Sequence, residues 1–168
     1  LKEMDAEEIE GMLFENSDEP LAKELARAIM SAKRKKQPIE TTSQLREIVE
    51  QGVLRTKPEN PKEAVKKTCQ RVFQALRIDV NSEFEVLDSF LEALPHILKP
   101  GGKAAILTFH SGEDRMVKKS FQYYAREGIY SDIAKDVIRP SAKECASNPR
   151  ARSTKFRWAV RSDVQKYE

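Results

Sequence analysis

The sequence predicts an α/β protein in two parts, an all-helical domain over residues 1–71 and the closing half of a doubly wound sheet over residues 72–168. Two observations support this division. Apolar residues recur at helical spacing through the first part, and the period changes after Pro100-Gly101-Gly102 to a short continuous apolar run. The order that follows is strand, helix, strand, loop and strand, which is typical of one half of such a sheet.

Capping signals place the helices of the first part. Asp5 and Glu8 form the pattern of a capping box, and Thr41 and Gln44 form a second one. Pro20 suits the first turn of another helix, where its missing N–H costs nothing. The predicted helices run from Asp5 to about Phe14, from Pro20 to about Lys33 and from Thr41 to Gly52. A longer helix follows the turn-prone residues 57–61 and carries apolar residues from Val65 to Leu76, and Asn81 caps the next one.

The second part begins with the most distinct strand of the sequence. Residues 103–109 are a short apolar run between a Gly-Gly turn and a polar cluster, which predicts a buried strand. A helix then begins at Ser111 or Glu113 and ends at Gly128. Two further strands are predicted at residues 136–139 and 155–160, joined by a basic loop over 140–154.

Composition and cysteine spacing limit the functional classes. Hydrophobic residues make up 39% and charged residues 34%, and no apolar run approaches the roughly 18 residues that a membrane span requires. Residues 1–5 have no feature of a signal or transit peptide. Cys69 and Cys145 form no Cys-x-x-Cys pair, so we expect no metal site and a reducing compartment, either the cytoplasm or an organelle matrix or stroma.

Charge is distributed unevenly along the chain. Residues 1–60 carry 10 Lys/Arg against 13 Asp/Glu, whereas residues 61–168 carry 20 against 14. Positive charge is densest over 139–161, where Glu144 is the one acid, and this segment is either a phosphate-contacting surface or a solvated basic loop. Residues 33–36 are also basic and either cap the end of a helix or contact RNA.

None of the glycines forms a G-x-G-x-x-G turn, which would bring backbone amides against a nucleotide cofactor. Cofactor-binding residues are therefore unassigned, and we do not expect this chain to catalyse a reaction by itself.

Three segments carry a resemblance to a known family. They are residues 71–81, which include Phe-Gln-Ala-Leu-Arg, residues 98–115, which include Pro-Gly-Gly and Phe-His-Ser-Gly-Glu-Asp-Arg, and residues 148–157, Asn-Pro-Arg-Ala-Arg-Ser-Thr-Lys-Phe-Arg. Together they resemble the MraW/RsmH-type family of small-subunit rRNA cytosine-N4 methyltransferases. The helical part is similar to the insertion domain of that family. One departure is Gly112, where the family usually has a larger apolar residue, and a looser or differently shaped turn is expected there.

The resemblance implies S-adenosylmethionine-dependent methylation of the exocyclic amine of a cytidine, with ribosomal RNA or the small ribosomal subunit as partner. It implies the C-terminal half of a class I, Rossmann-like methyltransferase sheet whose donor-binding half lies upstream. Two alternatives stay open: a non-catalytic remnant that binds RNA or a partner, and a helical scaffold with a solvated basic loop. An exposed sheet edge would also permit self-association.

The strand at residues 103–109 places the best site candidates, because ligands of open α/β sheets collect at the carboxyl ends of strands. His110 is expected to bind the base edge or accept the proton of the amine, with Glu113 or Asp114 orienting the imidazole. Phe109 either packs against a flipped base or belongs to the core. The further RNA-binding candidates are Ser111, Arg115, Gln74, Arg77, Asn148, Arg150 and Arg152. Gln74 and Arg77 share a helix face that serves either RNA or a purely structural role.

Overall fold

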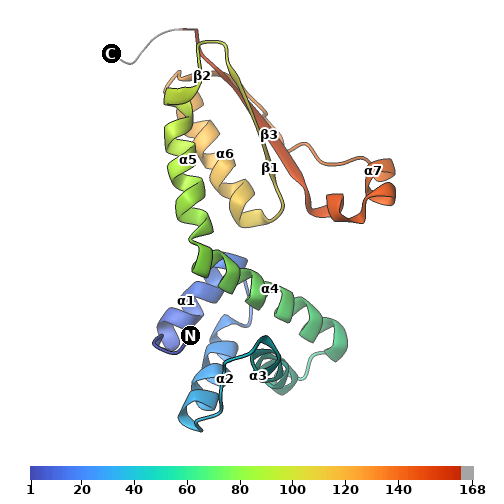
Figure 1. The fold of residues 1–168 in the computed structure, drawn as a ribbon. Coiled ribbons are helices and arrows are strands. Elements are labelled where there is room, and N and C mark those ends of the chain that lie inside the picture. The colour runs from blue at the N-terminus through green and yellow to red at the C-terminus, as the bar shows by residue number, and fades with distance from the viewer. Residues whose placement is uncertain (164–168) are drawn as a thin grey trace. The chain divides into compact units, whose positions relative to one another are not determined.

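The computed structural model describes residues 1–163, which form two compact units (Figure 1). The first unit is Leu1–Glu83 and the second begins at Phe84. The boundary expected from the sequence, between residues 71 and 72, falls inside a continuous helix, α4 (Pro61–Asn81). Helical spacing of apolar residues runs through that point without interruption, so the first unit continues to the end of the helix.

The first unit is a bundle of four helices. The predicted capping boxes are present at Asp5 and Thr41, and the Asn60 side chain accepts from the Glu63 amide at the start of α4. Apolar side chains from all four helices form one core, in which Ile9, Leu25 and Val49 are fully buried. The helices are α1 (Ala6–Ser17), α2 (Ala22–Arg34), α3 (Thr42–Arg55) and α4 (Pro61–Asn81).

Two predicted helix ends are wrong. Gly52 does not end α3, because the helix continues to Arg55 and the missing side chain lets Leu25 approach closely. A Cβ at Gly52 would lie 3.2 Å from the Leu25 side chain. Asn81 does not cap the following helix but is the last residue of α4, and Ser82 in the left-handed conformation ends that helix.

The second unit is a three-stranded sheet packed against helices (Figure 1). The strand order is β1-β3-β2, and β3 runs antiparallel to both neighbours. Its elements are α5 (Glu83–Ile97), β1 (Lys103–Thr108), α6 (Ser111–Arg126), β2 (Tyr130–Ile133), α7 (Ala142–Ser147), the 3-10 helix η1 (Pro149–Ser153) and β3 (Lys155–Arg161).

One predicted strand is misplaced. Residues 136–139 contribute a single bridge, between Ile138 and Phe156, whereas β2 lies earlier at Tyr130–Ile133. β2 is difficult to recognise in the sequence, because it contains the polar residues Ser131 and Asp132, whose side chains are both exposed. The loop predicted at 140–154 contains the short helices α7 and η1.

β1 is less buried than its apolar sequence predicts. Its residues alternate, with Ala104 and Thr108 buried and Leu107 exposed. Within residues 1–163, β1 pairs with β3 alone, so its other edge carries unpaired backbone groups. The core lies on the side of α5 and α6, where Leu91, Val117 and Phe121 pack against the sheet. In the part of the chain that the structure describes, no helix is long and apolar enough to cross a membrane.

Candidate functional site

His110 lies just beyond the carboxyl end of β1 and is the N-cap of α6. Its Nδ1 accepts from the Glu113 amide at 3.4 Å, so the neutral imidazole carries its proton on Nε2. The side chain is 11% exposed. The structure thus places His110 at the strand end predicted from the sequence, in a cap position that fixes the tautomer of the ring.

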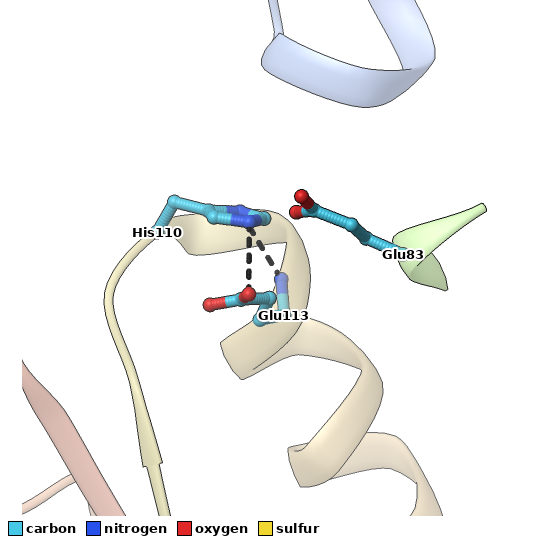
Figure 2. Close-up of side chains that lie close together, drawn as sticks. All are labelled: Glu83, His110 and Glu113. Carbon is cyan, nitrogen blue, oxygen red and sulfur yellow. Dashed lines mark hydrogen bonds and ion pairs between the residues drawn. The ribbon is translucent and has the colours of Figure 1, made fainter. Parts of the chain in front are cut away.

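The carboxylate of Glu113 is paired with the imidazole of His110 (Figure 2). Its Oε1 lies 3.2 Å from Nε2 of His110, and its Oε2 accepts from the Phe109 amide at 3.0 Å. The contact with the imidazole is electrostatic, since Nε2 meets no hydrogen-bond geometry with any residue of 1–163. Burial disfavours the charged carboxylate, but the imidazole and the backbone amides outweigh burial and lower the pKa of Glu113.

Asp114 points to a different partner. It holds Arg157 of β3 by two hydrogen bonds, from Nε to Oδ1 at 2.8 Å and from the terminal guanidinium nitrogen to Oδ2 at 3.1 Å. Both side chains are largely buried. The pair ties the first turn of α6 to the central strand of the sheet, so Glu113 and not Asp114 contacts the imidazole.

The side chains flanking His110 differ in accessibility. Phe109 is 57% exposed, which excludes it from the core of the second unit. Ser111 and Arg115 are exposed in the first two turns of α6. An aromatic face, a hydroxyl and a guanidinium are therefore accessible at the same end of the sheet as the His110 and Glu113 pair.

The arginines of η1 lie near this end of the sheet. Asn148 caps η1 and accepts from the Arg150 amide at 3.2 Å, and both Arg150 and Arg152 are exposed. η1 leads directly into β3, whose first residue, Lys155, is opposite Thr108 at the end of β1. The strand register therefore brings the basic segment and His110 to one edge of the second unit.

Gln74 and Arg77 belong to the helical unit. Arg77 forms a bidentate pair with Glu83, at 2.9 and 3.1 Å, and Gln74 is half-buried on α4. The carboxylate of Glu83 thus occupies the guanidinium of Arg77, which favours the structural role that the sequence left open for this helix face.

The one strand-to-helix turn of 1–163 that contains a glycine does not fit a nucleotide cofactor. Gly112 lies in the first turn of α6, and a Cβ there would be 2.7 Å from Cζ of Phe84. An aromatic ring therefore fills the space that a glycine would give to a phosphate in a cofactor loop. Gly112 lies in the regular first turn of α6, rather than in the looser or differently shaped turn expected at this departure from the family.

Sequence reasoning missed Arg157, the partner of Asp114. The two residues are separated by 43 positions, and no local pattern distinguishes Arg157 from the other cations of residues 139–161. The alternation of β3 gives a weak signal, because it places Arg157 on the same face as Ala159.

The arrangement is suited to orienting a hydrogen-bond donor. Glu113 is ionised at neutral pH and retains lone pairs beyond those that accept from Phe109 and face His110. The exposed arginines at the same end of the sheet can contact phosphates.

Comparison with known proteins gives consistent results. The MraW methylase family matches residues 1–162. The chain is 60% identical over 163 residues to ribosomal RNA small subunit methyltransferase H 1 of Lachnoclostridium phytofermentans, covering 96% of this chain and 44% of that protein. It is 61% identical to the protein of the same name from Agathobacter rectalis, covering 97% and 47%. It is 42% identical to ribosomal RNA small subunit methyltransferase H of Elusimicrobium minutum, covering 92% and 50%.

The chain spans about half the length of the curated relatives it matches. The match extends through both units, and it includes the His110 turn and the arginine segment. The chain belongs to the MraW methylase family.

Proposed function

We propose that this chain is the acceptor-binding portion of an S-adenosylmethionine-dependent enzyme that methylates the exocyclic amine of a cytidine in small-subunit ribosomal RNA. The observation that carries the proposal is the family match over both units together with the position of His110 and Glu113 at the end of β1. The relatives are named as ribosomal RNA small subunit methyltransferases. Ribosomal RNA or the small subunit is then the partner.

Glu113 is the proposed acceptor for the amine. The exocyclic amine of cytidine is a weak nucleophile, because its lone pair is delocalised into the ring. A carboxylate that accepts one N–H orients the amine and takes up the proton that it loses. His110 positions this carboxylate, since its Nδ1 is occupied by the helix amide and its Nε2 faces Oε1. Phe109 offers an exposed face on which a flipped base can stack.

The remaining candidates divide into RNA contacts and supports. Arg150 and Arg152 are proposed to hold phosphates beside the target nucleotide, with Asn148 fixing the turn that presents them. Ser111 and Arg115 contribute further contacts at the start of α6. Asp114 acts only through Arg157, by fixing α6 against β3.

The methyl donor is proposed to bind a part of the enzyme outside this chain. Within residues 1–163, the one strand-to-helix turn that contains a glycine has no room for a phosphate, because Phe84 fills the space at Gly112. Calorimetric titration of this chain with S-adenosylmethionine should therefore give no micromolar binding. Micromolar binding would contradict the assignment of the chain as a partial enzyme.

The acceptor role is tested in the enzyme encoded by the complete gene that contains this sequence. Its methylation of small-subunit RNA is measured by mass spectrometry of nucleosides, and Glu113→Gln should reduce the rate about 100-fold or more, in line with loss of a general base. His110→Asn preserves the helix cap and should lose less activity than His110→Ala. Unchanged activity of Glu113→Gln would remove Glu113 from the mechanism. Absence of N4-methylcytidine from the product of the unsubstituted enzyme would overturn the proposed function and favour a non-catalytic RNA-binding protein.

A further inference from the structure

A basic groove runs along α3 and α4 of the helical unit, remote in sequence from the arginines of η1. It has a volume of about 450 Å³, within the roughly 300–1,000 Å³ of pockets that bind small ligands. Its polar rim consists of Arg46 from α3 and Lys62, Lys66 and Gln70 from α4. The three rim residues of α4 are spaced four apart and form one row on the helix surface.

The cations of this rim form no close ion pair among residues 1–163, although Lys66 interacts electrostatically with Glu63. Within residues 1–163, no carboxylate lies at ion-pair distance from Arg46, Lys62 or Lys66. The nearby Glu63 instead pairs with Lys67 at 2.6 Å. Cations in an exposed groove attract an anionic partner.

The position of these lysines opposes the stability of α4. Lys62 lies in the first turn of α4, where the helix dipole disfavours a cation. Lys62 and Lys66 are like charges at i and i+4, which destabilises a helix by roughly 0.2–0.5 kcal/mol. The interaction with Glu63 favours Lys66 in the helix, but helix formation does not account for Lys62.

The floor of the groove is apolar. It consists of Val65, Cys69 and Phe73, which form a second row of α4 beside the row of the rim. Burial raises the pKa of the Cys69 thiol, so at neutral pH this residue is an uncharged part of the floor. Phe73 packs against the core of the helical unit and is only partly buried, so an aromatic surface is accessible in the groove.

We infer that this groove binds a single-stranded RNA segment, with phosphates on Arg46, Lys62 and Lys66 and a base against the apolar floor. Cations beside an aromatic surface are the features that proteins use to bind single strands. The Gln70 amide adds a donor and an acceptor for a base edge. An acidic protein would use the cations but not the apolar floor. The inference deepens the proposed function, because it names where RNA outside the modified nucleotide is held.

The test compares two triple variants of the full 168-residue chain. Arg46→Ala/Lys62→Ala/Lys66→Ala removes the rim, and Lys2→Ala/Lys23→Ala/Arg27→Ala removes the same charge from exposed residues outside the groove. The probe is a fluorescein-labelled single-stranded oligoribonucleotide of mixed sequence, measured by anisotropy over a range of salt concentrations. Far-UV circular dichroism and the melting temperature verify that each variant is folded.

The rim variant should bind at least 10-fold more weakly, and its slope of log K against log salt should be shallower by about 2, which is the loss expected for three contacts to a single strand. The control variant should keep the slope of the unsubstituted chain. An abasic oligonucleotide with the same number of phosphates should bind several-fold more weakly than the RNA. A polyaspartate competitor should displace the RNA poorly.

Equal losses in the two triple variants would overturn the inference, because net charge alone would then explain binding. Equal affinity for the abasic probe would overturn the assignment of the floor, and efficient displacement by polyaspartate would indicate an acidic protein partner instead. If Arg150→Ala/Arg152→Ala abolishes binding and the rim variant does not, the inference fails and the proposed function stands. If the unsubstituted chain binds no RNA, the RNA partner of the proposed function fails as well.

Discussion

Among residues 1–163, three exposed large apolar side chains lie in the helical unit and seven lie in the second unit. In the helical unit, side chains of α1 to α4 meet in one continuous core. In the second unit, α5 exposes Val86, Phe90 and Ile97, and the sheet exposes Leu107 at 57%. The first unit therefore has the larger core, and the second has a smaller core between its sheet and the helices α5 and α6.

The largest expected difference is between leucines of the two units. Leu25→Ala should destabilise the helical unit by about 2–5 kcal/mol, because Leu25 is fully buried and its removal leaves a cavity. Leu107→Ala should change the second unit by at most about 0.5 kcal/mol. Urea unfolding separates the units when circular dichroism at 222 nm is combined with fluorescence of the single tryptophan, Trp158 on β3. A large effect of Leu107→Ala would mean that the exposed face of β1 is covered in solution.

Two arginine–carboxylate ion pairs, one in each unit, have similar geometry but differ in burial. Arg157→Met leaves Asp114 largely buried without its partner and should cost about 3 kcal/mol in the tryptophan-detected transition. Arg77→Met breaks an equally short pair with Glu83, but the side chain of Arg77 is 57% exposed. Solvent screening should limit that loss to less than about 1 kcal/mol. If both variants lose the same stability, burial does not set the strength of these pairs.

Alkaline pH should destabilise the second unit through Tyr130. Burial raises the pKa of Tyr130 to about 12 from the ordinary value of 10.0. As the pH rises, the unfolded state loses the phenol proton before the folded state does. The contribution of Tyr130 to the free energy of unfolding is therefore intact below pH 10 and decreases as the pH rises through about 12. The loss should approach about 3 kcal/mol, since each pKa unit corresponds to about 1.4 kcal/mol.

Tyr130→Phe is the control for this pH dependence. The Tyr130 hydroxyl is buried and forms no hydrogen bond with any residue of 1–163, so its removal should not reduce stability at pH 7. All four tyrosines of the chain follow residue 84, so the helical unit should show no alkaline loss of stability from tyrosine ionisation. An identical alkaline loss in Tyr130→Phe would assign the effect to other groups.

Substitutions of two helical glycines should have effects of opposite sign. Gly11 of α1 has open space where a Cβ would lie, so Gly11→Ala should stabilise the helical unit by about 0.5–1 kcal/mol. Gly112→Ala should destabilise the second unit by about 1–3 kcal/mol, because its Cβ would meet the Phe84 ring. Adding Phe84→Leu to Gly112→Ala should recover part of the loss. Destabilisation by Gly11→Ala would show that α1 is covered at that point.

The helical unit could be predicted well because its signals are local. Asp5 with Glu8 and Thr41 with Gln44 encode helix starts within four residues, and the structure confirms both capping boxes. The end of α3 could not be predicted, because a glycine near the end of a helical pattern usually ends the helix. Here Gly52 instead allows Leu25 to pack closely against α3. The sequence of neither helix alone indicates that the two helices approach closely at this point.

The second unit was predicted less completely because its decisive contacts are distant in sequence. The strand before His110 was identifiable from its apolar run, but β2 contains Ser131 and Asp132 and was missed. Asp114 lies next to Glu113, and the sequence leaves open which of the two orients the imidazole. Its partner, Arg157, comes from another strand, so only the fold distinguishes the roles of these adjacent acids.

The one-sided pairing of β1 has a practical consequence for anyone preparing this polypeptide. A strand with an open row of amides and carbonyls, bordered by the exposed Leu107, can recruit the same strand of another molecule while the protein is refolding. Such recruitment is second order in protein, whereas folding is first order. Rapid dilution from denaturant should therefore raise the yield of monomer, and slow dialysis at high concentration should favour precipitates.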